Sequence, residues 1–408
     1  MKKKRILVLA STFPRWKNDT TPPFVYELEK RLTKNFEIHI LAPHCQGAKK
    51  EEIMDGLHIH RFQYFWPAKL QRLCYEGGIL PNLKKYFLAK LQVMPFFISE
   101  LITLIRIASV KKIEIIHSHW IIPNGLLAAI IKKMFRVKHI LTIHAGDLAL
   151  LDKLPFKKLL ARFIVDNTDQ ITFVSHFGKN LFVKILGQYK KIDKQSSIIP
   201  MGIDTKTFSR EINSYLRKNK LKVADRKNIL FIGRLAEKKG VEYLIRAVKI
   251  VTQSIKKIKI YIVGEGPLKE KLLNLSKELK IENIADFTGP KSGKAKMEFF
   301  AMADILVVPS IKTEFGDVEG IPVVLMEGLT SGKAIVASSV GGIPEIITNN
   351  INGLLVPEKD FQALAQSIIK VLNNNKLKAS LERGAKKSAG EYDLKIIAGK
   401  FNKLYSKL

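Results

Sequence analysis

Short apolar, β-branched runs alternate with helix-like stretches along the whole of this 408-residue chain. In the first half, such runs predict strands at Ile6–Ala10, Glu37–Leu41, Ile113–His117, His139–Ile143 and Ile171–Ser175. A second series predicts strands at Ile229–Ile232, Lys259–Val263, Ile284–Phe287, Ile305–Val308, Ala334–Ser338 and Gly353–Val356. Helices are expected between them, for example at Pro23–Leu32, Gly125–Phe135, Gly240–Ile250 and Pro267–Leu279. Because the runs are continuously apolar, both faces of each sheet should be covered, as in parallel α/β sheets.

The two series predict two domains of the α/β class, each a Rossmann-like, doubly wound parallel sheet. We place the first domain at residues 1–205 and the second at 206–390, with the boundary near Ile199–Asp204. The polar, basic stretch Ser209–Lys227 is interpreted as a linker with a short helix, and residues 391–408 as a last helix that packs back on the first domain. In such folds ligands bind at the carboxyl ends of the strands, here in the cleft between the domains.

Composition and the N-terminal sequence favour a cytoplasmic globular protein. The apolar content of 46% is ordinary, and the cysteines, Cys45 and Cys74, lack metal-ligand spacing, which suits a reducing compartment. The segment Met1–Ala10 resembles the start of a signal peptide, but its apolar run is short, so we interpret it as a first buried strand. A membrane-spanning helix needs about 18 uncharged apolar residues. The longest candidate, Val93–Val110, is interrupted by charges, so none is expected.

The net charge is +32, from 69 basic and 37 acidic residues, and it bears on partners rather than on fold. The chain shows no zinc spacing, basic heptad region or RNP-like aromatic strand, so nucleic acid is not an expected partner. Between Arg61 and Lys112, nine Lys and Arg side chains are mixed with aromatic ones. Aromatic rings insert at headgroup level and basic residues attract anionic lipid, so this segment predicts an anionic membrane surface as a partner. The alternative is a lysine-rich composition that decorates the surface without a specific partner.

The segment Glu319–Glu327 begins and ends with a glutamate, and a Gly, a Pro and an apolar run lie between the two. Pro322 favours a helix that begins between them, because proline is at home in a first helical turn. Glu319 would then lie in the preceding loop and Glu327 on the fifth or sixth residue of the helix. The free N–H groups of the helix start suit a diphosphate, and a carboxylate on each side can accept hydrogen bonds from hydroxyls. These features are typical of a nucleotide-sugar pocket; the alternative is a pair of surface glutamates on an amphipathic helix.

A second candidate element, Gly233–Gly240, directly follows a predicted strand. A strand, a small-residue turn and cations ahead of a helix form a phosphate-binding arrangement, in which Arg234 forks onto phosphate oxygens and Lys239 adds a point charge. Both would stabilise the charge of a departing nucleoside diphosphate. The alternative is an ordinary basic loop. The next glycine turn, Gly264–Pro267, is interpreted as a helix start rather than a ligand contact.

Histidines stand at the ends of two predicted strands of the first domain. His144 follows one strand, beside Gly146 and Asp147, and would face the cleft; the alternative is a hydrogen-bonded structural histidine. His117 and His119 end another strand. A pair at this spacing could hold a metal, but no third ligand is evident in the sequence, so we reject zinc.

Together these elements resemble the retaining family-4 glycosyltransferases, whose GT-B fold consists of two Rossmann-like domains facing each other across a cleft. The resemblance spans nearly the whole chain. It is specific because the family's motifs occur in order: Glu319 and Glu327; Gly233, Arg234, Leu235, Lys239 and Gly240; His144, Gly146 and Asp147; the hinge residues Pro200, Gly202, Asp204 and Phe208; Gly341–Glu345; and Asn352–Val356. The first loop, Ser11–Phe24, departs from the pattern, because it lacks the paired glycines that many members place against the donor phosphates. Glu314 offers another register for the first glutamate, but the spacing to Glu327 favours Glu319.

The resemblance implies a role for each matching position. Arg234 and Lys239 would bind the donor diphosphate, and Glu327 would hold the ribose hydroxyls. Glu319 and the N–H groups near Gly320, Ile321 and Pro322 would hold the donor sugar, and His144 would lie near the reacting centre. Retention would proceed by same-face attack, in which the departing phosphate oxygen takes the acceptor proton. No protein nucleophile, metal or cofactor is then required.

The sequence therefore predicts a retaining hexosyltransferase that uses a UDP- or GDP-linked sugar and a lipid-linked or polysaccharide acceptor in cell-surface glycan synthesis. The first domain would meet the acceptor and the membrane, and the second would hold the nucleotide-sugar donor. The protein would lie in the cytoplasm, peripherally associated with the inner face of the membrane. One alternative is a GT-B-fold nucleotide-sugar epimerase, which would not need Glu319 to hold a sugar. Another is a non-catalytic basic scaffold that binds membrane or nucleic acid, since a fold alone does not fix a function.

Overall fold

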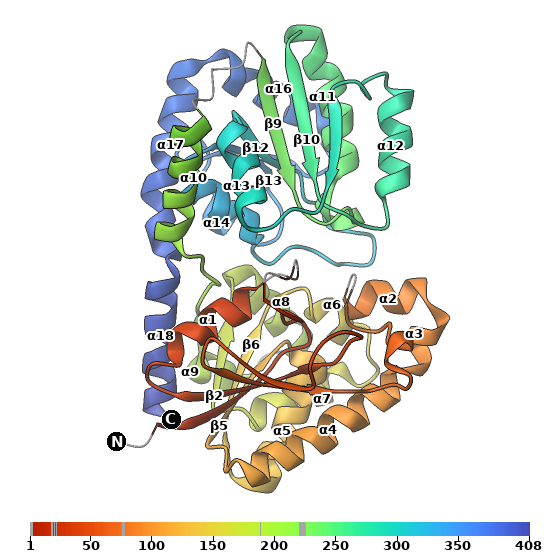
Figure 1. Ribbon diagram of the computed structural model, residues 1–408, viewed down its shortest axis with the longest axis vertical. Coiled ribbons are helices and arrows are strands. Elements are labelled where there is room, and N and C mark those ends of the chain that lie inside the picture. Colours follow the sequence, from red (N-terminus) through yellow and green to blue (C-terminus); the bar gives the residue numbers. More distant parts are fainter. Residues whose placement is uncertain are drawn as a thin grey trace. The chain divides into compact units, whose positions relative to one another are not determined.

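A computed structural model describes residues 3–408 except 18, 20, 22, 76–77, 188 and 220–225. Parts of four sequence interpretations lie outside the described residues: Met1 and Lys2 of the N-terminal segment, Thr20 and Pro22 of the first loop, Glu76 of the basic aromatic segment and residues 220–225 of the expected linker. The chain divides into two compact units. Unit 1 consists of Met1–Pro200 and Lys395–Leu408, and unit 2 consists of Met201–Leu394 (Figure 1). The acceptor-side and donor-side roles expected of these two regions stay predictions.

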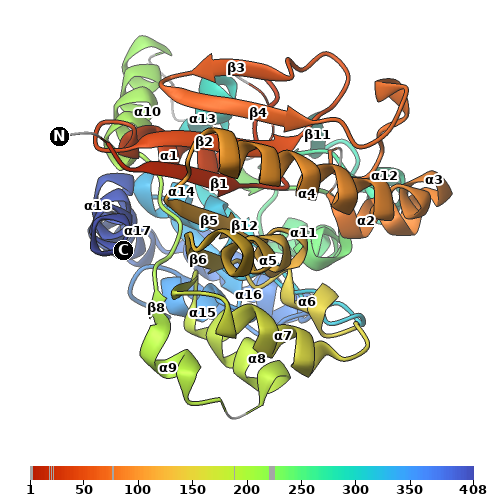
Figure 2. The same cartoon turned by 90° about the horizontal axis from the view of Figure 1, so that it is seen from below.

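The described part of unit 1 holds an eight-stranded sheet in the order β3-β4-β2-β1-β5-β6-β7-β8, with β3 and β4 at one edge (Figure 2). Its strands are β1 (Arg5–Leu9), β2 (Glu37–Pro43), β3 (Glu51–Met54), β4 (Leu57–Phe62), β5 (Ile115–His119), β6 (Lys138–Ile143), β7 (Gln170–Phe173) and β8 (Ser196–Ile198). All neighbouring pairs are parallel except β3 with β4. The N-terminal run is β1, paired between β2 and β5, which confirms a strand there.

Helices cover both faces of this sheet and bury its apolar side chains. They are α1 (Phe24–Leu32), α2 (Ile79–Lys85), α3 (Phe87–Leu91), α4 (Val93–Val110), α5 (Leu126–Phe135), α6 (Leu148–Leu151), α7 (Lys157–Asp166), α8 (His176–Leu186), α9 (Lys191–Gln195) and α18 (Leu394–Lys407), with shorter turns η1 (Ala68–Leu70) and η2 (Ile121–Gly125). The last helix, α18, joins unit 1 although unit 2 precedes it in the chain. Its buried Tyr405 hydrogen-bonds to α1 and β5, which fixes it in place.

The described part of unit 2 holds a six-stranded parallel sheet in the order β11-β10-β9-β12-β13-β14. The strands are β9 (Lys227–Ile232), β10 (Ile258–Val263), β11 (Ala285–Gly289), β12 (Ile305–Val308), β13 (Ala334–Ser338) and β14 (Leu354–Val356). The helical elements are α10 (Thr205–Asn219), η3 (Glu237–Lys239), α11 (Val241–Ser254), α12 (Lys269–Glu278), α13 (Gly293–Met302), α14 (Val323–Thr330), α15 (Ile343–Ile346), α16 (Phe361–Asn373), α17 (Asn375–Ala389) and η4 (Gly390–Tyr392). The α/β prediction is confirmed, and every strand predicted from the sequence is present with its ends shifted by at most two residues.

Two sequence interpretations need correction. The sheet of unit 1 is mixed rather than parallel, because β3 and β4 form an antiparallel hairpin. Its turn, Asp55-Gly56, has positive φ at both residues (49° and 85°), the backbone that an Asp-Gly hairpin turn requires. The expected linker at Ser209–Lys227 is also wrong over its first part, since the long helix α10 runs from Thr205 to Asn219 and packs on α13 and α14.

The helix α4 is long and apolar enough to cross a membrane by length and composition alone, and 28% of the residues in this stretch are buried. The sequence led us to expect no such helix, and a lone candidate is weak support for one. Phe96, Glu100 and Leu104 of α4 are buried in the core of unit 1. We therefore describe α4 as a helix of that unit, with one face packed and one face bare.

Candidate functional site

The loop between β9 and α11, Gly233–Gly240, is held from two sides at the carboxyl edge of the sheet. On one side the Leu235 amide donates to the Glu265 carbonyl (2.9 Å), and a Cβ at Gly264 would lie 1.8 Å from the Gly233 carbonyl oxygen. On the other side Gly240 has a φ of +62°, and a Cβ there would lie 1.8 Å from the Pro309 carbonyl oxygen. Glycine is needed at both positions because backbone passes directly over backbone.

The glycine turn at Gly264–Pro267 leads into α12, which begins at Lys269, as interpreted from the sequence. The turn also has a second role. A Cβ at Gly266 would lie 2.4 Å from the Leu235 carbonyl oxygen, so this turn, like Gly264, supports the loop that carries Arg234 and Lys239.

The cations of this loop face carboxylates of the loop before α14. The Lys239 Nζ lies 3.1 Å from Glu319 Oε1. Lys238, which the sequence interpretation omitted, lies 3.8 Å from the same oxygen and 3.2 Å from Asp317 Oδ1. Arg234 is half-buried; burial lowers the pKa of its guanidinium, and the charge of Asp317 acts in the opposite direction. The structure thus brings Arg234, Lys239 and Glu319 together at one edge of unit 2.

Glu319 is an ionised carboxylate in a mostly dry place. Burial raises the pKa of Glu319, but the charges of Lys239 and Lys238 outweigh burial and leave that pKa below its ordinary value. The ion pair with Lys239 lacks hydrogen-bond geometry, so Oε1 is buried without a hydrogen-bond donor among the described residues. Such an oxygen is available to a ligand hydroxyl, which would supply the missing donor.

Two glycines hold the backbone of Glu319 and Gly320 in place. Gly341 has a φ of +61°, and a Cβ there would lie 2.1 Å from the Glu319 carbonyl oxygen. A Cβ at Gly342 would lie 1.9 Å from the Gly320 carbonyl oxygen, and the Gly342 amide donates to Glu319 at 3.2 Å. The Gly341-Gly342 turn is therefore the support on which the candidate sugar-binding loop rests.

The helix α14 begins at Val323, directly after Ile321 and Pro322, as predicted. Glu327 is its fifth residue, and only 11% of its side chain is exposed. Its carboxylate pairs with Lys296 of α13, a residue that the sequence analysis did not single out. A buried Lys–Glu pair across two helices holds Glu327 at the carboxyl edge, beside the start of the helix.

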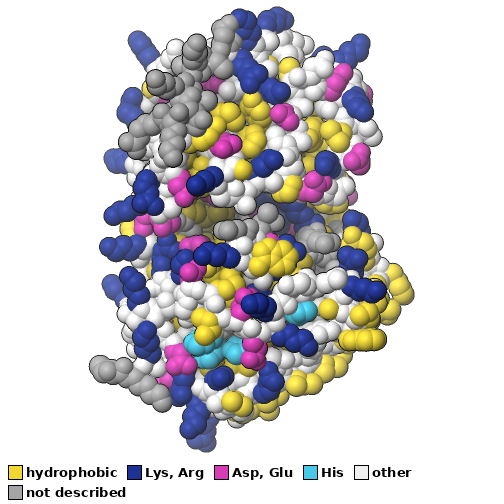
Figure 3. Space-filling view, viewed as in Figure 1, with side chains coloured by type: hydrophobic (Ala, Val, Ile, Leu, Met, Phe, Trp, Pro, Cys, Tyr) yellow, Lys and Arg dark blue, Asp and Glu magenta, His cyan; other side chains and the backbone are white. Residues whose placement is uncertain are grey.

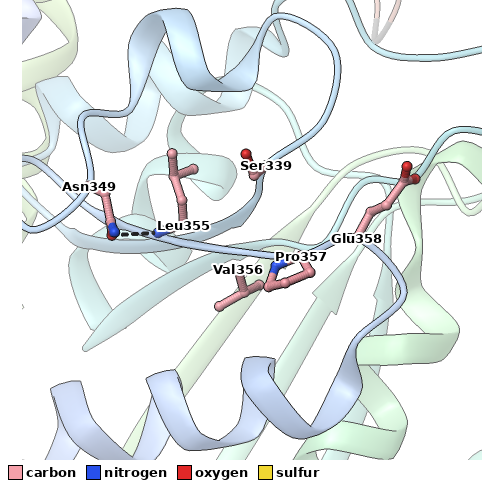
Figure 4. Close-up of a pocket in the computed structure, with 6 residues that line it drawn as sticks. All are labelled: Ser339, Asn349, Leu355, Val356, Pro357 and Glu358. Atoms are coloured by element: carbon pink, nitrogen blue, oxygen red, sulfur yellow. Dashed lines mark hydrogen bonds between the residues drawn. The ribbon is translucent and has the colours of Figure 1, made fainter.

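A shallow cavity of about 610 Å³ opens at the same edge, where β13 and β14 end. Ser339, Asn349 and Leu355–Glu358 line it, and an amide-to-side-chain hydrogen bond joins Leu355 to Asn349 (Figure 4). The Glu358 carboxylate accepts a hydrogen bond from the Lys312 amide (2.6 Å), which ties the end of β14 to the loop after β12. Leu355 and Val356 belong to β14 and to the motif Asn352–Val356, whereas the other lining residues were not predicted, since they lie in loops without a recognisable motif.

His144 lies in unit 1, after β6, and is enclosed by aromatic rings. Its imidazole stacks on Trp120 with the ring centroids 4.9 Å apart, and Phe24 lies 5.4 Å away. Its Nε2 is 3.0 Å from Nδ1 of His119. Burial, with the neighbouring His117, lowers the pKa of His144 to about 3, so the imidazole is neutral at physiological pH.

Asp147 fixes the two loops around His144. Its carboxylate accepts hydrogen bonds from the amides of Ile121 (2.7 Å) and His144 (3.2 Å). Burial raises the pKa of Asp147 to about 6, against the opposing effect of these amides. Between them Ala145 has a φ of +69°, in the left-handed region, so the backbone turns sharply beside the histidine. Asp147 is thus a positioning residue for His144.

A third candidate metal ligand, missed in the sequence, lies beside His117 and His119. It is Glu29 of α1, and the three side chains present ligand atoms within 4.8 Å of one another in a fully buried place. The premise on which zinc was rejected is therefore wrong. Glu29 is remote in the sequence and stands in an ordinary amphipathic helix, so no spacing could have shown it.

The fold defines a class: two Rossmann-like α/β units, the second of them with cations and carboxylates at the carboxyl edge of its sheet. Two family models match consecutive parts of the chain. "Glycosyltransferase Family 4" matches residues 23–207, and "Glycosyl transferases group 1" matches residues 213–388. The chain belongs to the family-4 glycosyltransferases and has the GT-B fold.

Known relatives and solved structures agree with this assignment. An uncharacterised glycosyltransferase of Methanocaldococcus jannaschii is 26% identical over 384 residues, 94% of this chain and 93% of the relative. The N-acetyl-alpha-D-glucosaminyl L-malate synthase of Bacillus anthracis is 27% identical over 342 residues, 82% of this chain and 85% of the relative. The sucrose-phosphate synthase of Thermosynechococcus elongatus superimposes with a TM-score of 0.78 at 17% identity, over 99% of both chains.

A further solved structure carries a ligand. HepE of Anabaena, in complex with UDP-glucose, superimposes with a TM-score of 0.71 at 16% identity, over 99% of this chain and 100% of the other. Several other relatives are glycosyltransferases of polysaccharide or glycolipid biosynthesis. The comparisons do not test the individual site residues, whose roles stay predictions.

Proposed function

We propose that this chain is a retaining glycosyltransferase that transfers a hexose-type sugar from a UDP- or GDP-linked donor to a lipid-linked or growing polysaccharide acceptor. The observation that carries this proposal is the buried carboxylate of Glu319 beside the start of α14. It pairs with Lys239, and its Oε1 still lacks an aligned hydrogen-bond donor among the described residues. A ligand that carries both hydroxyl groups and negative charge fits this place, because a hydroxyl can donate to Glu319 and the negative charge is attracted by Lys239 and the start of α14.

The diphosphate of the donor is met by cations in this proposal, without a metal. Arg234 forks onto phosphate oxygens, Lys239 adds a point charge, and the first amides of α14 point at the same region. When the bond between the anomeric carbon and the phosphate oxygen breaks, these groups stabilise the negative charge that develops on the leaving diphosphate. Oε1 of Glu319 accepts a hydrogen bond from a hydroxyl of the sugar, and Glu327 accepts hydrogen bonds from the ribose hydroxyls.

In this proposal the anomeric configuration is retained because the acceptor attacks the sugar on the same face from which the phosphate leaves. The acceptor oxygen bonds to the anomeric carbon while its proton passes to the departing phosphate oxygen, so no side chain is consumed. His144 is neutral at physiological pH and is held by Trp120 and His119. It can therefore donate or accept a hydrogen bond at the sugar without adding a charge to the oxocarbenium-like state.

Thermal unfolding with nucleoside diphosphates tests the donor pocket. UDP, GDP and ADP are added without metal to the wild type, to Glu327→Gln and to a control, Glu278→Gln, whose side chain is exposed at the end of α12. A ligand at 100 times its dissociation constant stabilises by about 2.7 kcal/mol. We expect one nucleotide to raise Tm of the wild type and the control, and much less that of Glu327→Gln. No shift with any nucleotide would overturn the proposal.

A bare apolar face of unit 1 supports a membrane-bound acceptor. Hydrophobic side chains gather over α2, α3 and α4 in the space-filling view (Figure 3). The exposed members on α3 and α4 are Phe87, Leu91, Met94, Ile98, Ile102 and Val110. Met94, Ile98 and Ile102 repeat every four residues and form one stripe on α4.

Basic residues flank this stripe, among them Lys90 and Arg106, as expected for a helix that lies on an anionic bilayer. Each basic residue near such a surface adds about 1 kcal/mol of attraction. We propose that this face holds the protein, peripherally, on the cytoplasmic leaflet where a lipid-linked acceptor would be found.

Sedimentation with phosphatidylglycerol vesicles, beside phosphatidylcholine vesicles, tests the membrane proposal. We expect the wild type to sediment with the anionic vesicles and Ile98→Glu to remain in the supernatant. The control is Ile53→Glu, at an equally bare isoleucine (68% exposed) on the edge strand β3. If Ile98→Glu and Ile53→Glu sediment alike, the stripe on α4 does not carry the binding.

A further inference from the structure

The buried cluster between α1 and β5 is built from residues with metal-binding chemistry. Glu29, His117 and His119 are each 0% exposed, and one oxygen or nitrogen of each lies within 4.8 Å of the others. The Tyr405 hydroxyl, from α18, lies 2.6 Å from Nδ1 of His117 and donates to Oε1 of Glu29 at 2.9 Å. Three elements of unit 1 that are far apart in the sequence, α1, β5 and α18, thus meet at one point.

Two polar atoms of this cluster have no hydrogen-bond partner in the part of the chain that the structure describes. They are Oε2 of Glu29 and Nε2 of His119. A buried polar atom that stays unpaired costs about 1–3 kcal/mol. Native proteins satisfy almost all such atoms, and a bound water or ion is the usual explanation for those that lack a protein partner. A carboxylate and an imidazole that both lack partners at one place point to a shared ligand.

We propose that Glu29, His117 and His119 bind a divalent ion of the zinc class. Two histidines and one carboxylate form a known zinc ligand set, with bonds of about 2.0–2.2 Å. Ligand atoms around a tetrahedral ion are then roughly 3.3 Å apart. Oε1 of Glu29 and Nδ1 of His117 already lie 3.5 Å apart. The ligand atom of His119 lies within 4.8 Å of the other two, so the side chains would close by at most about 1.5 Å around an ion.

The site is closed and therefore structural rather than catalytic. A catalytic zinc keeps one position open to water, whereas these side chains are fully buried and the Tyr405 oxygen is the nearest further donor. The ion would pin α1 and α18 to β5. This proposal is independent of the proposed function, because it concerns a different set of atoms in unit 1.

The ion would also set the tautomer of His144. A metal on Nε2 of His119 leaves the proton of that ring on Nδ1, because a neutral imidazole carries only one N–H. That N–H then donates to Nε2 of His144, 3.0 Å away, and orients the ring that stacks on Trp120. Ligand histidines commonly use the second ring nitrogen in this way.

A second group of histidines offers a matched control. His39, His58 and His60 stack on β2 and β4, with Nδ1 of His39 3.1 Å from Nε2 of His60 and Nε2 of His39 3.1 Å from Glu37. His39 thus has partners at both ring nitrogens, unlike His119. If histidines of this protein bind zinc, the ion could lie at either group. A variant in each group therefore distinguishes the two positions.

Zinc binding by the full chain, purified without a histidine tag, tests the proposal. Zinc is measured by mass spectrometry after dialysis against metal-free buffer, and its affinity by titration against a coloured chelator. We expect one zinc per chain. Glu29→Gln should weaken binding by at least about 100-fold, and His58→Gln should leave it unchanged.

Each other result overturns the proposal. A chain that takes up no zinc at micromolar concentration would mean that a water joins Glu29 to His119. Equal affinity of Glu29→Gln and wild type, or loss of zinc in His58→Gln, would place the ion elsewhere. If Glu29→Gln does not fold, the Co²⁺ spectrum of the wild type decides: intense tetrahedral bands support the site, and the weak bands of an octahedral surface ion contradict it.

Discussion

In unit 2, the groups at the carboxyl edge of the sheet are charged and meet opposite charges: Lys239 and Lys238 hold Glu319, and Lys296 holds Glu327. In unit 1, burial moves the pKa of the groups at the matching edge towards the neutral form, and no opposite charge among the described residues reverses it. Burial lowers the pKa of His144 to about 3, and burial raises the pKa of Asp147 to about 6. All of these side chains are largely removed from water. The two units therefore differ in whether a buried group has an oppositely charged neighbour.

Burial pushes every ionisable group towards its neutral form, and a nearby opposite charge reverses this. Unit 2 supplies such charges in pairs, so the pKa of Glu319 lies below its ordinary value. Unit 1 supplies aromatic rings and backbone amides instead. Burial raises the pKa of Glu100 of α4 to about 8, and its Oε2 lacks a hydrogen-bond partner among the described residues. A pair of preformed charges suits a diphosphate donor, and the neutral imidazole of His144 suits the uncharged part of a sugar transfer.

Removal of one charge from unit 2 should have the largest effect. In Glu319→Gln the shape stays, but the charged partner of Lys239 is lost and a neutral amide oxygen replaces the charged acceptor for the sugar hydroxyl. We expect kcat/KM for transfer or donor hydrolysis to fall by about 100-fold, the worth of a hydrogen bond to a charged group. Lys256→Gln, at an exposed lysine of the same unit, is the control. Loss of less than threefold in Glu319→Gln would remove this pair from the active site.

A change of backbone support should have an intermediate effect, without any change of charge. Gly342→Ala places a methyl group 1.9 Å from the Gly320 carbonyl oxygen, so the loop of Glu319 must move. We expect a destabilisation of about 1–3 kcal/mol and at least tenfold lower activity. Gly390→Ala is the matched control, because a Cβ there meets nothing within 4 Å and its φ is −60°. Equal activity of the two variants would show that the Gly341-Gly342 turn is not a support.

The neutral side of the comparison predicts a pH dependence of stability. The folded-state pKa of Glu100 is raised to about 8 from an ordinary value near 4.5. The contribution of the protonated Glu100 to the free energy of unfolding is therefore complete below about pH 4.5 and is lost as the pH rises to about 8. The loss is at most about 5 kcal/mol. Glu100→Gln cannot ionise, so urea unfolding should show it more stable than the wild type at pH 9 and not at pH 4. Parallel curves for the two proteins would mean that Glu100 has a solvated or charged partner.

The sequence was sufficient for the architecture because the strands of both units are continuous apolar runs, a pattern that few other folds produce. The sequence was insufficient for the edge strand β3 and for the helix α10. The strand β3 has the sequence Glu-Glu-Ile-Met, and its residues alternate between exposed and half-buried. The Asp55-Gly56 turn is the sequence signal that could have indicated it. The region of α10 was interpreted as a linker with only a short helix because it is rich in polar residues. The packing of the longer helix on α13 and α14 is a tertiary effect.

The candidate site divides in the same way. Elements whose residues are neighbours in the chain, such as Pro322 and Glu327, could be placed from spacing alone, and α14 confirms the placement. Lys296 and Glu29 could not, because each reaches the site from a helix distant in the sequence. The supporting roles of Gly264 and Gly342 depend on contacts between loops, which only the folded backbone shows.

The position of α18 has a consequence for biosynthesis. Unit 1 is interrupted by the whole of unit 2, since its final helix is made about 200 residues after Pro200. At about 5–20 residues per second, the first part of unit 1 waits on the order of 10–40 s on the ribosome before Tyr405 exists. During that interval Glu29 and His117 lack the hydroxyl that joins them in the finished protein. Unit 2 is therefore complete first, and the final step of folding belongs to the unit whose synthesis began earliest.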